Sequence, residues 1–144
     1  MFVLVKTSNP SSVEIQDLVV DGDCVHIHTA RLVDSLNDDR VGKTGYGPVG
    51  AVVGATWPDL VVTLRKILSR SILLLPGYGA QGAGAEDVAR AFDSEGQGAL
   101  VSASRSITFP WAAESSCPTD WIDRIGQAAD EMSRDLRRVS TFGA

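Results

Sequence analysis

The residues best suited to chemistry occupy two short segments, each of which follows an apolar run of strand length. The first is the glycine-rich stretch Gly77-Tyr78-Gly79-Ala80-Gln81-Gly82, and the second is the pair Ser104-Arg105. Glycines let backbone amides approach an anion, and the forked guanidinium of Arg105 fits a phosphate through two hydrogen bonds. Gln81 can donate from the loop, and the amides around Ser104 and Arg105 are expected to begin a short helical turn facing the same anion. Together the two segments predict a phosphate site.

The same glycines permit another interpretation, because Gly77, Gly79 and Gly82 match the GxGxxG pattern of dinucleotide-binding folds. Those folds use an acidic residue after the next strand to hold a ribose hydroxyl, whereas this chain has Arg105 there, which suits the extra phosphate of NADP. Against this interpretation, the motif follows the third apolar run of the chain rather than the first, and Pro76 stiffens the turn. An NADP-binding α/β domain stays open as an alternative.

Two further motifs are interpreted as structural. Gly42-Lys43-Thr44 has the ending of a phosphate-binding P-loop, but Asn37 stands where the first glycine belongs and the segment follows a predicted helix, which favours a solvated loop. Cys24-x-His26-x-His28 has the residue types of a metal site, yet residues two apart on a helix point in different directions. We expect no metal, and we expect Cys24 and Cys117 to be free thiols in a reducing cytosol.

Four apolar runs predict the strands that position these residues. They cover residues 2–5, 49–53, 72–75 and 98–102, and helical patterns lie between them and after the last one. Strands that alternate with helices predict parallel βαβ units with right-handed crossovers, and no linker divides the chain. We therefore expect an α/β fold of about four βα units in one domain, residues 1–144, with residues 110–138 as its C-terminal helical segment.

The helices are predicted from apolar residues that recur at helical spacing. The first is expected from Asp23, its N-cap, to about Leu36, and the second after Thr56, its cap, with Pro58 in the first turn. The third is expected over residues 86–92 and the last from Asp120 to about Arg138. The apolar stripes are predicted to comprise Val25, Leu32, Val33 and Leu36 in the first helix, Leu60, Val61, Leu64 and Leu68 in the second, and Trp121, Ile125, Ala128, Met132 and Leu136 in the last.

Composition narrows the class of partner. The chain has 144 residues, of which 44% are hydrophobic and 22% charged, and its net charge is -5. An acidic balance argues against nucleic acid or an anionic membrane as a partner, although a local site can still bind a phosphorylated metabolite. With no basic leader before an apolar run and no run long enough to span a bilayer, we expect a cytoplasmic protein.

Four strand ends, in this order and spacing, resemble those of a known family, orotidine 5'-phosphate decarboxylase in its longer bacterial subgroup. The segments that carry the resemblance are Val3-Leu4-Val5-Lys6-Thr7-Ser8-Asn9-Pro10, Val49-Gly50-Ala51-Val52-Val53-Gly54-Ala55-Thr56, Leu75-Pro76-Gly77-Tyr78-Gly79-Ala80-Gln81-Gly82 and Val101-Ser102-Ala103-Ser104-Arg105. They are similar to the last four strand ends of the family's (β/α)8 TIM barrel. The resemblance therefore implies the C-terminal half of such a barrel.

The resemblance also implies roles for individual residues. Ser8 matches the family's serine that hydrogen-bonds the pyrimidine ring, Gln81 the residue on the loop that closes over the phosphate, and Arg105 the arginine that holds it. The loop scaffold comprises Pro76, Gly77, Tyr78, Gly79 and Gly82, and Ser104 is expected to contribute to the phosphate site. The implied reaction converts orotidine 5'-phosphate to UMP and carbon dioxide in pyrimidine biosynthesis, without a metal or organic cofactor.

One part of the family pattern is missing. The family's proton donor belongs to an alternating Lys/Asp array on earlier strands, whereas Lys6, Lys43 and Lys66 are the only lysines here and none has aspartates at alternate positions on a strand. We therefore expect no catalytic residue in this chain and no decarboxylation by the chain alone. A full barrel needs about 250 residues, so we expect pairing with a complementary N-terminal half or with a second copy. A non-catalytic, phosphate-binding half-barrel is the other interpretation.

Overall fold

The core of the molecule is a four-stranded parallel sheet. The computed structural model describes residues 1–114 and 116–140, and its strands are β1 (Phe2–Lys6), β4 (Gly50–Val53), β5 (Leu73–Pro76) and β6 (Ala99–Ser102). They lie side by side in chain order, β1-β4-β5-β6, and every pair is parallel. The predicted strands are thus confirmed to within one residue, and Pro76, which follows the predicted strand, is the last residue of β5.

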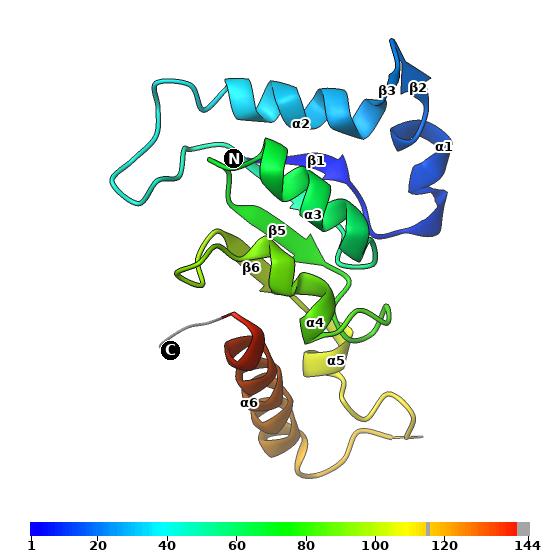
Figure 1. Ribbon diagram of the computed structural model, residues 1–144. Coiled ribbons are helices and arrows are strands. Elements are labelled where there is room, and N and C mark those ends of the chain that lie inside the picture. Colours follow the sequence, from blue (N-terminus) through cyan, green and yellow to red (C-terminus); the bar gives the residue numbers. More distant parts are fainter. Residues whose placement is uncertain (115, 141–144) are drawn as a thin grey trace.

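Helices follow the strands along one side of the sheet (Figure 1). They are α2 (Val25–Ser35), α3 (Pro58–Ile67), α4 (Ala85–Val88) with the 3-10 turn η2 (Ala89–Ala91), α5 (Arg105–Thr108) and α6 (Trp121–Val139). Between β1 and α2 the chain adds elements that the apolar pattern does not predict: the 3-10 turn η1 (Pro10–Ser12), α1 (Val13–Gln16) and a hairpin of β2 (Val19–Val20) and β3 (Asp23–Cys24). These extra elements follow β1 and Ser8, which lies just beyond the end of that strand.

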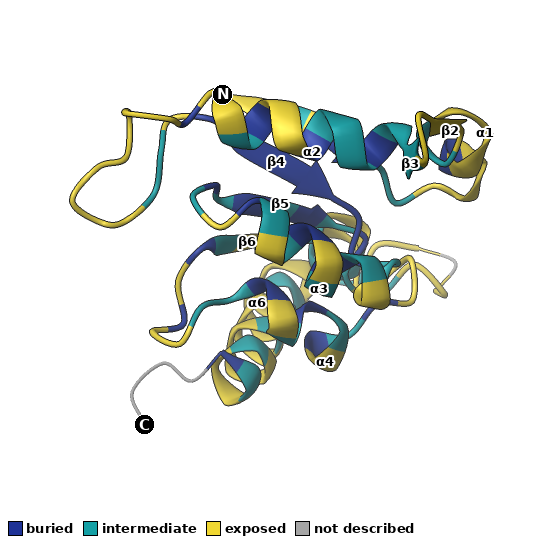
Figure 2. Ribbon diagram, turned by 45° about the horizontal axis from the view of Figure 1, so that its top comes forward, coloured by how far each residue is buried: buried dark blue, intermediate teal, exposed yellow. Residues whose placement is uncertain are grey.

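The hydrophobic core lies between the sheet and its helices (Figure 2). Alternate strand residues such as Val5, Val53 and Leu73 pack there against Val33 of α2 and Leu64 of α3, and all five are at most 1% exposed. The opposite face of the outer strands is open, because Leu4 on β1 and Leu100 on β6 are 63% and 52% exposed. The sheet is therefore covered by helices on one face and uncovered at its two outer strands on the other.

Several expectations about the helices are wrong in detail. The buried residues of α2 are His26, Ala30 and Val33, whereas Leu32 and Leu36 are exposed. Spacings of four and three residues along a helix define that buried stripe, and Leu32 lies just outside it. The N-caps of α2 and α3 are Cys24 and Trp57 rather than Asp23 and Thr56.

The displaced capping residues have other partners. The Asp23 carboxylate accepts a hydrogen bond from Arg31 at 2.6 Å, and the Thr56 hydroxyl donates to the carbonyl of Ser8 at 3.0 Å. The last helix follows most of its predicted face, since Ile125, Met132 and Leu136 are partly buried, but Trp121 is exposed and no residue of α6 is fully buried. None of the helices in the described part of the chain is long and apolar enough to cross a membrane.

Candidate functional site

The predicted site residues come together at the carboxyl ends of the strands. A cavity of about 110 Å³ lies between the loop after β5 and the loop after β6, and Gln81, Ser104 and Arg105 all line it. A larger open pocket of about 430 Å³ lies beside it and is lined by Ser8, Asn9, Pro10, Thr56, Trp57 and Gln81. Because Gln81 lines both, the two spaces meet at the tip of the glycine-rich loop.

The glycine-rich loop owes its shape to backbone conformations that favour glycine. Gly77, Gly79 and Gly82 have φ angles of +105°, +71° and +95°. The amide of Gly79 donates to the carbonyl of Ala83, and the amide of Gly82 donates to the carbonyl of Gly79, both at 2.8 Å. These two amides are therefore engaged within the loop. The glycines shape the cavity wall, and the anion contacts are left to side chains and other amides.

Arg105 begins α5, and Ser104 is its N-cap, so the short helical turn expected after β6 is present. Both residues are exposed, and the Arg105 side chain takes part in none of the ion pairs among the described residues. Some other arginines are paired, for example Arg70, whose guanidinium contacts Asp34 and Asp38 at 2.7 and 2.6 Å. Arg105 therefore presents an uncompensated positive charge at the small cavity.

Ser8 is held by its backbone rather than by its side chain. Three successive carbonyls accept hydrogen bonds: that of Lys6 from the Gly54 amide at 2.7 Å, that of Thr7 from the Trp57 indole at 2.9 Å, and that of Ser8 from Thr56 at 3.0 Å. A side chain at position 54 would lie 2.6 Å from the Ser8 Cα, so only glycine permits this approach. The half-buried Ser8 hydroxyl takes no part in these contacts and borders the larger pocket.

Sequence reasoning missed several residues of this region. Asn9, Pro10, Thr56 and Trp57 also line the larger pocket, and Lys6 lies buried next to it, with its ammonium 4.6 Å from the centre of the Trp57 ring. The apolar pattern signals strands and helices but does not say which loops converge. The adjacency of β1, β4 and β5 in the sheet brings these loops together.

The motifs interpreted as structural lie away from these cavities. His26 Nδ1 lies 2.8 Å from the Gln16 carbonyl and His28 Nε2 lies 2.8 Å from the Val20 carbonyl, so the two rings have different partners. No group of three potential metal-ligating side chains occurs within residues 1–114 and 116–140. Lys43 is exposed in the loop after α2.

The strand order defines the class of fold. A dinucleotide-binding sheet reverses its strand order and carries helices on both faces, whereas here the order follows the chain without reversal. Four parallel βα units wound in one direction form half of a (β/α)8 barrel, the architecture in which loops after the last two strands commonly hold phosphate. The glycine-rich motif therefore belongs to a barrel loop, and the NADP interpretation loses its structural basis.

Comparison with known proteins gives the family. The chain is 48% identical over 141 residues to orotidine 5'-phosphate decarboxylase of Rhodopirellula baltica, covering 95% of the chain and 47% of that enzyme. It is 47% identical over 109 residues to the same enzyme of Deinococcus radiodurans, covering 76% of the chain and 39% of the relative. The chain is thus homologous to orotidine 5'-phosphate decarboxylase, and it spans less than half the length of these curated relatives. No protein-family model matches the chain.

Solved structures agree with the sequence relatives. A Toxoplasma gondii structure named for orotidine-monophosphate decarboxylase superposes with a TM-score of 0.75 at 28% identity, covering 97% of this chain and 51% of that one. The UMP synthase of Leishmania donovani superposes with a TM-score of 0.72 at 27% identity, covering 96% of this chain and 27% of that one. The half-barrel fold inferred from the resemblance is confirmed.

Proposed function

We propose that this chain provides the phosphate-binding and nucleotide-binding half of an orotidine 5'-phosphate decarboxylase. The observation that carries the proposal is the cavity of about 110 Å³ that gathers Gln81, Ser104 and Arg105 from two neighbouring loops. Arg105 has no ion-pair partner among the described residues, so its guanidinium is available for a phosphate. The ligand class is orotidine 5'-phosphate or its product UMP.

The pocket beside this cavity suits the nucleoside part of such a ligand. Gln81 borders both spaces, so a molecule with its phosphate near Arg105 can extend past the loop tip toward Ser8. The Ser8 hydroxyl, free of the contacts that fix its backbone, is then available to hydrogen-bond the pyrimidine. Trp57 and Pro10 provide apolar surface for the rings. The cytoplasmic location that we expect fits a metabolite ligand.

Decarboxylation itself needs a proton for the carbon that loses carbon dioxide, and none of the three lysines of this chain lines either cavity. Lys6 is only 1% exposed and its ammonium lies 2.6 Å from Asp17, while Lys43 and Lys66 are exposed and line neither cavity. The proton donor therefore has to come from a partner. We expect the isolated chain to bind nucleotide without turning over orotidine 5'-phosphate.

The sheet is built to accept such a partner. Leu4, Val52, Leu74 and Leu100 are register neighbours from strand to strand, so they form one inward-facing apolar row. Both ends of the row are exposed, and the outer strands β1 and β6 leave backbone groups without neighbours among the described strands. Four further parallel strands with branched inward side chains would pair with both edges and close an eight-stranded barrel. A complementary N-terminal half is the partner that we propose.

Calorimetry tests the binding proposal. Wild type, Arg105→Ala and the matched control Lys43→Ala are titrated with UMP and with inorganic phosphate. Loss of a forked, charge-assisted contact should weaken UMP binding by about 1.5–3 kcal/mol, roughly ten- to hundredfold, whereas the exposed Lys43 should change it by less than about 0.5 kcal/mol. Equal losses in the two variants would refute the assignment of Arg105, and a wild type that binds neither ligand would refute the proposed function.

Complementation tests the pairing proposal. The chain is mixed with the part of the Rhodopirellula baltica relative that it does not match, and the mixture is analysed by size-exclusion chromatography with light scattering. We expect a 1:1 complex that consumes orotidine 5'-phosphate in a UV assay, whereas neither half alone does so. A chain that elutes as a monomer and does not bind the complementary half would contradict the argument that the outer strands β1 and β6 need pairing partners.

A further inference from the structure

Lys6 is a buried cation that the proposed binding contacts do not use. Its side chain is 1% exposed at the end of β1, and its ammonium lies 2.6 Å from the Asp17 carboxylate and 4.6 Å from the centre of the Trp57 ring. Burying a charge is costly unless it is paired, and the gain from pairing rarely exceeds the cost of desolvation. Stability alone is therefore a weak explanation for a lysine at this position.

The Lys6–Asp17 pair joins the two ends of the loop formed by residues 7–16. Residues 7–16 leave the sheet at β1 and return through η1 and α1, and Asp17 follows the end of α1. A second contact joins the same two ends, because the Thr7 amide donates to the Gln16 side chain at 2.9 Å. The loop between these contacts carries Ser8, Asn9 and Pro10, which form one wall of the larger pocket. The Lys6–Asp17 pair and the Thr7–Gln16 hydrogen bond therefore fix a segment that borders the proposed nucleoside site.

His26, on α2, contacts the C-terminal end of this loop. Its Nδ1 lies 2.8 Å from the Gln16 carbonyl and 3.0 Å from the Asp17 carboxylate. Both neighbours are acceptors, so Nδ1 carries the proton and donates it to the Gln16 carbonyl, while the Asp17 carboxylate accepts from Lys6 and lies beside the same ring nitrogen. The Lys6 ammonium is also the main reason that the pKa of Asp17 lies below its usual value. The end of α1 is thereby joined to both β1 and α2.

We propose that Lys6 is a positioning residue for nucleotide binding, which fixes the 7–16 loop so that the Ser8 hydroxyl faces the pocket. The inference rests on the proposed nucleotide site. Lys6 touches no ligand in this scheme; it acts through Asp17 on one side and through the Trp57 ring on the other. The Trp57 indole also donates to the Thr7 carbonyl. The backbone next to Ser8 therefore depends on a ring that contacts the Lys6 ammonium.

Two measurements on Lys6→Met test the proposal, with the exposed Lys66→Met as the matched control. In amide hydrogen exchange, we expect residues 7–17 to exchange at least about tenfold faster in Lys6→Met, while the central strands β4 and β5 keep their protection. In calorimetry, we expect UMP to bind at least about tenfold more weakly and inorganic phosphate to change by less than about twofold, because Lys6 does not line the small cavity. Lys66→Met should resemble wild type in both.

A second variant covers the case in which Lys6→Met does not fold. Asp17→Asn changes a carboxylate that is 37% exposed, and it weakens the pair while keeping the side-chain shape. We expect faster exchange in residues 7–17 and weaker UMP binding in this variant too, with smaller changes than in Lys6→Met. Unchanged exchange in residues 7–17 in a folded variant would overturn the proposal, as would UMP and phosphate affinities that fall together. If wild type binds neither ligand, the proposed function fails, whereas the exchange experiment still decides whether Lys6 fixes the loop.

Discussion

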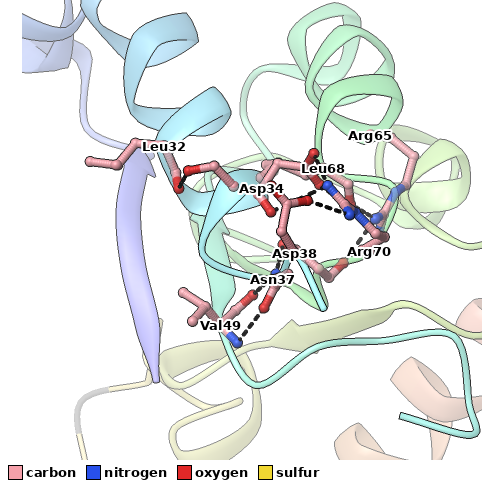
Figure 3. Close-up of polar contacts among 10 residues, drawn as sticks. Leu32, Asp34, Asn37, Asp38, Val49, Arg65, Leu68 and Arg70 are labelled. Carbon is pink, nitrogen blue, oxygen red and sulfur yellow. Dashed lines mark hydrogen bonds and ion pairs between the residues drawn. The ribbon is translucent and has the colours of Figure 1, made fainter. Parts of the chain in front are cut away.

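Asn37, at the amino ends of the strands, offers a sharp test of how this half-barrel is stabilised. The residue is fully buried, and Figure 3 shows its side chain directed at Val49. The amide nitrogen donates to the Val49 carbonyl at 2.8 Å and to the Ser71 hydroxyl at 2.9 Å, and the side-chain oxygen accepts from the Val49 amide at 3.0 Å. One side chain thus pairs with both backbone polar groups of the residue that leads into β4.

The change Asn37→Ala removes all three hydrogen bonds and leaves the Val49 groups buried, since Val49 is 6% exposed. Each buried polar group without a partner costs about 1–3 kcal/mol, so two backbone groups and a small cavity together predict a loss of about 3–5 kcal/mol. Domains of this kind are stable by about 5–15 kcal/mol, so the variant should lose a large part of its free energy of unfolding.

Urea unfolding followed by circular dichroism measures this loss. The control is Asn9→Ala, because Asn9 is exposed and its side chain donates one exposed hydrogen bond, to the Ser11 hydroxyl; that variant should lose less than about 0.5 kcal/mol. Asn37→Asp should also be destabilised, because its carboxylate would face the Val49 carbonyl in place of a donor. A loss below about 1 kcal/mol for Asn37→Ala would refute the reasoning and would mean that other groups or water replace the amide.

Three further predictions concern other parts of the molecule. Burial and the hydrogen bond to Asp93 raise the pKa of Tyr46 to about 12, so its contribution to stability should be complete below pH 10 and lost as the pH rises to 12; Tyr46→Phe should flatten the alkaline unfolding curve in that range. Gly79→Ala would place a Cβ 2.6 Å from the Ser106 hydroxyl at a positive φ, so it should weaken phosphate binding in calorimetry, and unchanged affinity would show that the loop adapts. The isolated chain should not decarboxylate orotidine 5'-phosphate, and turnover above the uncatalysed rate in protein free of host enzyme would contradict this.

The strands could be predicted from sequence because their signal is local. A run such as Leu73-Leu74-Leu75 is apolar on both faces, which is typical of a strand in a parallel sheet, and the structure places β5 there. The meeting of Gln81, Ser104 and Arg105 was also predictable, because parallel strands in a barrel bring the loops at their carboxyl ends together. The small cavity is lined from both loops as expected. Their role in binding stays a prediction.

What could not be predicted depends on contacts between distant residues. The stripe on α2 was misassigned because Leu32 and Val33 are both apolar, and only packing against the sheet selects Val33. The Lys6–Asp17 pair joins residues eleven apart through a loop whose path no periodic pattern reveals. The expectation that the glycine amides contact the anion was also too simple, since the amides of Gly79 and Gly82 donate hydrogen bonds to carbonyls within the loop.

Polar side chains have partners within the chain at the amino ends of the strands but are exposed at the carboxyl ends, and this difference supports the proposed position of the binding site. At the amino ends Asn37 is fully paired (Figure 3), and the half-buried Arg65 donates to the carbonyls of Leu68, Ser71 and Gly98. At the carboxyl ends Arg105 and Gln81 are exposed beside a cavity. A group that already has partners gains little from a ligand, whereas one that gives up only water gains more. Lys6 is the exception at the carboxyl ends: its ammonium is buried beside Asp17 and lines neither cavity, so we assign it a positioning role and expect the proton donor to come from a second half.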